Sequence, residues 1–181
     1  MKTAGILLLL AAMPAGSQIV NRPASVVASI DQPRFSLDII HSLEKDFDRK
    51  LDAAGPVPLH VMGFSRGLYL PGYGLVFTAE VDLMNTPVSG GILNRKIEAP
   101  ERASIHERKL AQLPLLQHLM QEMVTASAQR LDMMPENEHI VLAVRLWYQG
   151  WEDQTRLPSQ IVMSADRKSA MAGLIKEEST K

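Results

Sequence analysis

The pentapeptide Gly63-Phe64-Ser65-Arg66-Gly67 has the spacing of a serine nucleophile motif, Gly-x-Ser-x-Gly. In α/β-hydrolases this pattern forms a strained turn between a strand and a helix, which lifts the serine hydroxyl towards oxyanion donors. Asp132 and His139 follow in the chain order of a Ser-Asp-His triad. One hypothesis is therefore a small hydrolase that uses Ser65, Asp132 and His139.

The residues that follow the motif argue against this chemistry. Leu70-Pro71-Gly72-Tyr73 has proline and glycine at the two central positions that a type II turn prefers. The chain is therefore expected to turn back into a second strand instead of entering a helix. A serine in that context is not presented as a nucleophile, and Gly63 and Gly67 are interpreted as strand-end or turn residues.

Acidic residues and a histidine offer a second catalytic alternative. Glu80, Asp82 and His139 supply carboxylates and an imidazole, which form a site only if the fold brings them together in a concave surface. Thr78, Glu80 and Asp82 alternate with apolar residues in a predicted strand, and we interpret this polar row as solvated surface. The sequence contains no His-Glu-x-x-His motif, and we predict neither a metal nor a cofactor.

Aromatic residues are concentrated in the two predicted strand connections. A cation such as Arg66 can stack on an aromatic ring, and a ligand or partner surface results if the two connections lie side by side. The alternative is ordinary aromatic packing at the margin of the sheet. The residues of this predicted binding surface are Arg66, Tyr69, Tyr73, Trp147 and Trp151.

The same hairpin resembles a segment found in bacterial proteins. Residues 66–78 include the sequence Tyr-Leu-Pro-Gly-Tyr-Gly at 69–74, and this segment resembles uncharacterised exported bacterial proteins with a similar hairpin. The resemblance implies a location in the bacterial envelope. It brings no activity, cofactor or catalytic residue with it.

Composition excludes several classes of partner and site. The chain has 181 residues, of which 46% are hydrophobic and 22% are charged, and this is the ordinary range for one globular domain. The formal net charge is −1, so no strong positive field is available for nucleic acid, which we exclude as a predicted partner. Cysteine is absent, which excludes disulfides and thiolate metal sites.

The first residues have the three-part pattern of a secretory signal peptide. Lys2 precedes an apolar run at 4–12, and small residues follow Pro14. We predict a signal peptide over residues 1–17 that is cleaved before Gln18, because the run is shorter than the roughly 20 residues needed to span a bilayer. The alternative is a buried N-terminal helix. The expected product is an exported protein without a membrane span, located in the periplasm or the medium.

Hydrophobic spacing predicts the elements that must position these residues. Residues 35–51 repeat apolar side chains at steps of three and four, which predicts an amphipathic helix. Ser104 and Glu107 match a capping box, so a second helix is expected from there to Leu131, with a kink or break at Pro114. Further expectations are strands at 59–64, 75–84, 140–148 and 160–163, a long connection at 85–102, and a short helix capped by Ser164 or Asp166 that ends at Gly173.

The strand at 140–148 is nearly continuous in apolar residues, which is typical of a central strand covered on both faces. We expect it to pair antiparallel with 160–163. The predicted fold class is α+β, a two-layer sandwich with helices on one face of a mainly antiparallel sheet of four or more strands, and with a possible helix-strand-strand duplication. The predicted organisation is a signal peptide at 1–17, a linker at 18–34 with a short edge strand at 25–30, one domain at 35–173, and a polar tail at 174–181.

These observations favour a binding or structural module of the bacterial envelope. The expected partner is an envelope protein or another extracytoplasmic ligand, whose identity the sequence leaves open. The alternative is a small hydrolase that uses Ser65 or a site of carboxylates and histidine.

Overall fold

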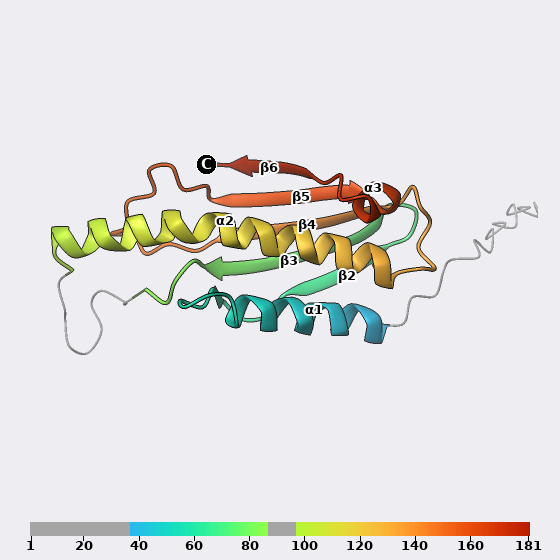
Figure 1. The fold of residues 1–181 in the computed structure, drawn as a ribbon, viewed down its shortest axis with the longest axis horizontal. Helices are drawn as coiled ribbons and strands as arrows, with labels where there is room; N and C mark the ends of the chain where they lie inside the picture. The colour runs from blue at the N-terminus through green and yellow to red at the C-terminus, as the bar shows by residue number, and fades with distance from the viewer. Residues whose placement is uncertain (1–36, 87–96) are drawn as a thin grey trace, which may run out of the picture. The chain divides into compact units, whose positions relative to one another are not determined.

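A computed structural model describes residues 37–86 and 97–181 of the chain (Figure 1). The predicted signal peptide, the linker with its edge strand at 25–30, and residues 87–96 of the predicted long connection lie outside these residues. The elements in chain order are α1 (Leu37–Asp52), β1 (His60–Val61), β2 (Arg66–Leu70), β3 (Gly74–Asp82), α2 (Ala99–Arg130), β4 (His139–Leu146), β5 (Gln160–Asp166), α3 (Arg167–Met171) and β6 (Lys176–Thr180).

The strands form one mixed, mostly antiparallel sheet, and the fold class is α+β, as predicted. The strand order is β1-β3-β4-β5-β6, and β2 pairs with β3 along the same edge as β1. Only β3 and β4 are parallel among the described pairs, and α2 provides the crossover that a parallel connection needs. Figure 1 shows α1 and α2 on the same side of the sheet, where they pack on each other and on the strands.

The hydrophobic core lies between the helices and one face of the sheet. Strands β3, β4 and β5 alternate buried and less buried residues, as the period of two in a strand requires. The amphipathic stripe of α1 is buried against them, as predicted. The largest side chains of the core include Phe47, Phe77, Leu43, Leu75, Leu116 and Met120.

Helix α2 begins earlier than predicted and continues through Pro114. It begins at Ala99, with Pro100 in the first turn, where a proline removes an N–H that has no helical acceptor. Ser104 therefore lies inside the helix, and the capping-box prediction is wrong. Pro114 does not end the helix. It lies on the exposed side, where water can bind the carbonyl oxygen that the proline ring leaves without a donor.

The C-terminal segment is part of the sheet. Asp166 caps α3, because its carboxylate accepts a hydrogen bond from the backbone N–H of Ser169 at 2.8 Å. Gly173 follows the helix with a φ of 74°. Residues 176–180, predicted as a polar tail, form β6 and pair antiparallel with β5. Their polar side chains are compatible with an edge strand, since the pairing is made by the backbone.

In chain order, α1 is followed by the three strands β1, β2 and β3, and α2 is followed by the two strands β4 and β5, before α3 and β6. The second unit has the predicted order of helix, strand, strand, whereas the first contains one additional short strand. A duplication of the sequence itself stays a prediction.

Candidate binding surface

Ser65 fastens α1 to the sheet. Its side chain is fully buried, and its hydroxyl donates a hydrogen bond to the backbone carbonyl of Glu44 at 3.1 Å. Its backbone N–H donates to the carboxylate of Asp48 at 3.1 Å. The hydroxyl is therefore sealed between a helix and a strand, where no substrate can reach it.

Gly67 explains the second half of the Gly-x-Ser-x-Gly motif. Its backbone N–H donates to the Glu44 carboxylate at 2.6 Å. A Cβ atom at this position would lie 2.6 Å from the side chains of both Ile40 and Phe77. A glycine is therefore needed for α1 to approach β2 this closely, and the motif serves packing.

The fold does not bring the predicted catalytic residues together. Arg66, next to Ser65, pairs with Thr78 in β3, whereas His139 pairs with Gly74. These positions are four residues apart along β3, which is about 13 Å. Asp132 lies exposed in the connection between α2 and β4. The Ser-Asp-His hypothesis therefore has no geometric support.

The second catalytic alternative fails for a related reason. Glu80 and Asp82 lie towards the C-terminal end of β3, whereas His139 is beside its first residue. The carboxylates and the imidazole are therefore at opposite ends of the sheet. The predicted solvated row is also wrong at one member, because Asp82 is only 2% exposed.

The two strand connections also lie at opposite ends. Because β3 and β4 run parallel, the turn before β3 and the connection after β4 are separated by the length of the strands. Tyr69 and Tyr73 therefore lie at one end of the sheet, and Trp147 and Trp151 at the other. The predicted single aromatic surface is not formed.

Tyr69 and Tyr73 have different roles in the hairpin. Tyr69 packs against the core, and its hydroxyl donates to Glu138 at 2.8 Å. Burial, followed by the hydrogen bond to Glu138, raises the pKa of Tyr69 to about 12. Tyr73 is exposed, and its backbone N–H closes the turn on Leu70 at 3.0 Å. Gly72 has a φ of 78°, as a type II turn requires.

Trp151 packs at the margin of the sheet, as the alternative interpretation of the aromatic residues expects. It lies against a small cluster of Met84, Ile97 and Ile105. The guanidinium of Arg102 is 5.9 Å from the centre of its ring.

The face of the sheet opposite α1 and α2 presents a set of apolar side chains that sequence reasoning missed. Register places Leu68, Val76 and Val141 in one row across β2, β3 and β4, and Ala143 and Val162 in the next row. Leu68 is 61% exposed, and the other four are half-buried. We call these five residues the apolar strip, and this side of the sheet the open face, because no described helix or strand covers it.

Charged residues surround the apolar strip. Arg66 and Glu178 lie at opposite ends of the row that contains Ala143. Arg145 lies 3.8 Å from Glu80 in the next row, measured from Nε to Oε1. An apolar centre with a polar rim is the usual composition of a protein-binding surface.

The predicted cover of β4 is present on one face only. The strand lies in the middle of the sheet and pairs antiparallel with β5, as predicted. However, Val141 and Ala143 on the open face are half-buried, whereas Ile140, Leu142 and Val144 on the helix face are fully buried. The strand has the composition of one covered on both sides, and half of that cover is not found among residues 37–86 and 97–181.

A buried ion cluster at the C-terminal end of β3 was also missed. Lys109 in α2 is fully buried, and its ammonium lies 2.7 Å from Asp82 and 2.6 Å from Glu152. It also lies 5.2 Å from the centre of the Tyr148 ring. The sequence feature that could have revealed this cluster is Lys109 itself, which lies within the buried stripe of α2, four residues after Ile105. We call Lys109, Asp82 and Glu152 the buried triad, and its closed geometry indicates a structural role.

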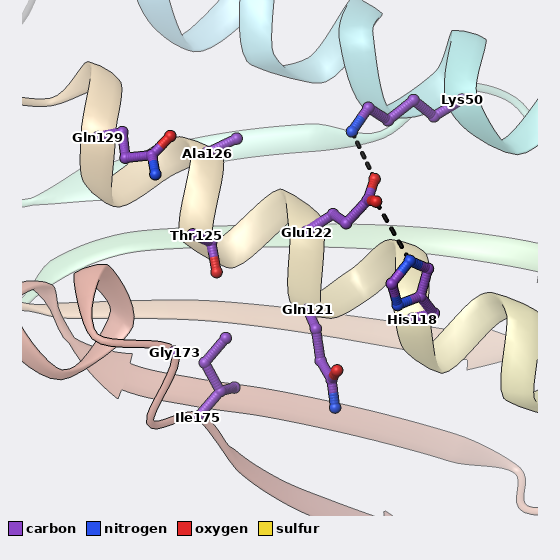
Figure 2. Close-up of a pocket in the computed structure, with 9 residues that line it drawn as sticks. All are labelled: Lys50, His118, Gln121, Glu122, Thr125, Ala126, Gln129, Gly173 and Ile175. Atoms are coloured by element: carbon purple, nitrogen blue, oxygen red, sulfur yellow. Dashed lines mark hydrogen bonds and ion pairs between the residues drawn. The ribbon is translucent and has the colours of Figure 1, made fainter.

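A second ion chain lines an open groove of about 450 Å³ between α1, α2 and the segment before β6. Figure 2 shows Lys50 reaching from α1 to Glu122, which also meets His118 one turn away on α2. The two distances to Glu122 are 2.6 and 3.2 Å. The hydrogen bond from Lys50 lowers the pKa of Glu122. The ammonium of Lys50 and the carboxylate of Glu122 neutralise each other, and His118 also contacts Glu122, so this pair leaves no charge free for a ligand.

No group of three or more His, Asp and Glu side chains in the described part of the chain is placed to hold a metal ion. Among the described helices, none combines the length and the apolar character needed to cross a membrane. Comparison of the chain with models of protein families, with curated proteins and with solved structures gives no match.

Proposed function

We propose that this chain is an exported binding module of the bacterial envelope, and that it holds a protein partner on the open face of its sheet. The observation that carries the proposal is the mismatch at β4. The helix face of this strand is buried, whereas its open face presents the half-buried Val141 and Ala143 between His139 and Arg145, and no described helix covers them. A protein partner on the open face would supply the missing cover.

Two further features support a protein partner. The apolar strip crosses four adjacent strands of one face of the sheet, whereas a small molecule is usually held in a concave pocket. The rim carries charges of both signs, including Arg66, Arg145 and Glu178, and such a rim gives specificity at a protein interface.

Export is the part of the proposal that depends on residues 1–17. Their pattern supports secretion to the periplasm or the medium, with cleavage before Gln18. Mass spectrometry of the protein isolated from the periplasm and the medium tests this step. A mature chain that begins at Gln18 is expected, and an intact N-terminus in the cytoplasm would contradict export.

The binding surface is tested by capture from an envelope fraction with a matched pair of variants. Leu68→Glu places a charge in the apolar strip, whereas Leu174→Glu places the same charge at a leucine between α3 and β6. The two leucines are 61% and 70% exposed, so neither substitution disturbs the core. We expect Leu68→Glu to lose the partner that the wild type and Leu174→Glu both retain. Equal recovery by all three proteins would reject the open face.

The hydrolase alternative is tested separately with a fluorophosphonate probe. We expect no labelling of the purified protein, because the Ser65 hydroxyl is buried and bonded to the Glu44 carbonyl. Labelling that disappears in Ser65→Ala would favour catalysis instead.

A further inference from the structure

The sheet is centred on β4, with two strand positions on each side of it. β3 and then the β1/β2 edge lie on one side of β4, and β5 and then β6 lie on the other (Figure 1). β1 and β2 occupy one position because they pair with successive parts of β3. The open face therefore has a middle line that runs along β4.

From this arrangement we infer that the partner on the open face is a second copy of this chain, related by a two-fold axis parallel to β4. The inference rests on the proposed function, since it uses the open face as a protein-binding surface. Such an axis places β4 against β4, β3 against β5, and β2 against β6 of the second copy. Two sheets packed face to face in this way lie about 10 Å apart.

The charges at the two edges complement each other under this rotation. One register row contains, in order, Arg66, Thr78, Ala143, Val162 and Glu178. The rotation reverses the row, so Arg66 faces Glu178 of the second copy, and Glu178 faces Arg66 of the second copy. The same contact is therefore made twice, at opposite edges of the interface.

Both of these side chains are accessible in a single copy. The guanidinium of Arg66 is exposed and lies 5.5 Å from the centre of the Phe64 ring. Glu178 is exposed and pairs with Lys176, its neighbour on the same face of β6. The reach of an arginine and a glutamate together is sufficient to span two packed sheets.

Apolar residues meet at the middle line. Val141 and Ala143 of β4 face their own counterparts, and Val76 lies beside Val141 in the same row. Arg145 also faces its counterpart. Its charge is balanced within each copy by Glu80, at 3.8 Å.

The available area is sufficient for a specific dimer. Five strand positions about 4.8 Å apart and seven residues of about 3.3 Å each cover about 24 by 23 Å, which is about 550 Å². Two copies therefore bury on the order of 1,100 Å², just above the lower limit of about 1,000 Å² for a biological interface. A reversible dimer is expected at this size.

Sedimentation equilibrium of the full chain tests the inference with variants in which the charges at positions 66 and 178 are reversed, singly and together. We expect the wild type to form dimers as its concentration rises, and Arg66→Glu or Glu178→Arg alone to weaken the dimer about tenfold or more, because like charges then meet at both edges. The double variant Arg66→Glu/Glu178→Arg should restore the pairing to within about threefold of the wild type. Arg108→Glu, at an exposed arginine of α2, is the control for the change of charge and should leave the dimer unchanged.

Three results would overturn the inference. The first is a wild type that stays monomeric at its highest soluble concentration. The second is a dimer that Ala143→Glu leaves unchanged, because Ala143 faces its own counterpart and two carboxylates would then meet at the middle line. The third is a double variant no better than the two single variants. If the wild type is monomeric but still captures an envelope protein in a way that depends on Leu68, only the dimer inference is rejected. If the wild type neither dimerises nor captures a protein, the proposed function is rejected as well.

Discussion

The two faces of the sheet are made by the same strands and differ in what covers them. On the helix face, α1 and α2 bury alternate residues of β3, β4 and β5 almost completely. On the open face, the intervening residues of β4 and β5, and those of β3 between its buried ends at Gly74 and Asp82, stay half-buried or exposed. Comparison of the two faces shows that the alternation in the strands sets which residues share a face, and that the attachment of the helices decides which face is closed.

The helix face is held by specific contacts as well as by apolar packing. Ser65 and Gly67 bind α1 through its backbone and carboxylates, and the buried triad joins α2 to β3 and to the connection after β4. The described interactions on the open face are exposed ion pairs at its rim, which contribute little to stability. This difference in stabilisation between buried and exposed contacts can be tested with pairs of similar substitutions, one at a buried position and one at an exposed position.

The largest effect is expected from the buried triad. Lys109→Met leaves Asp82 and Glu152 buried without their cation, so we expect the free energy of unfolding to fall by about 3–5 kcal/mol. Lys50→Met, at the exposed ion chain, should cost less than about 1 kcal/mol. Urea denaturation measures both. Adding Asp82→Asn and Glu152→Gln to Lys109→Met should recover part of the loss, and no recovery would show that the charges are not its cause.

A smaller effect is expected from neighbouring residues of β4 that lie on opposite faces. Leu142→Ala removes a fully buried side chain and should cost about 2–5 kcal/mol. Val141→Ala removes a half-buried one and should cost about 1 kcal/mol or less. Thermal or urea unfolding at low protein concentration avoids any contribution from association. Equal losses would mean that the open face is covered even in a single copy.

Gly67 tests the fit between α1 and the sheet. Gly67→Ala introduces a Cβ that would overlap Ile40 and Phe77, so we expect a loss of about 1–3 kcal/mol from overpacking. Gly150→Ala is the control, because a Cβ there meets no atom within 4 Å, and it should change stability by no more than about 0.5 kcal/mol. A neutral Gly67→Ala would show that α1 can move away from β2.

The smallest effect concerns the ionisation of Tyr69 on the helix face. Its pKa is raised from 10.0 to about 12 in the folded chain, so the folded state holds the proton more tightly than the unfolded state. The resulting stability is present below about pH 10 and is lost as the pH rises towards about 12. We expect the difference in stability between the wild type and Tyr69→Phe to fall over this interval in alkaline denaturation series. A constant difference would contradict the raised pKa.

The local elements of the fold could be predicted because their causes are local. The stripe of α1, the Pro71-Gly72 turn and the cap at Asp166 each depend on residues a few positions apart. Residues 176–180 could not be predicted as a strand, since their pairing with β5 is made by backbone groups and leaves no apolar pattern in the sequence. The predicted break at Pro114 does not occur, because the exposed position of this proline lets the helix continue.

The candidate site was harder to predict because it depends on which strands are neighbours. The sequence by itself determined the combination of helices and strands, the hairpin at Pro71-Gly72, and the apolar run at 140–144 in β4, since spacing and turn chemistry act within short segments. The parallel pairing of β3 with β4 was decided by tertiary structure alone. That pairing separates Ser65 from His139, places the two aromatic connections at opposite ends, and aligns the apolar strip on one face, because contacts between distant segments depend on the topology of the sheet.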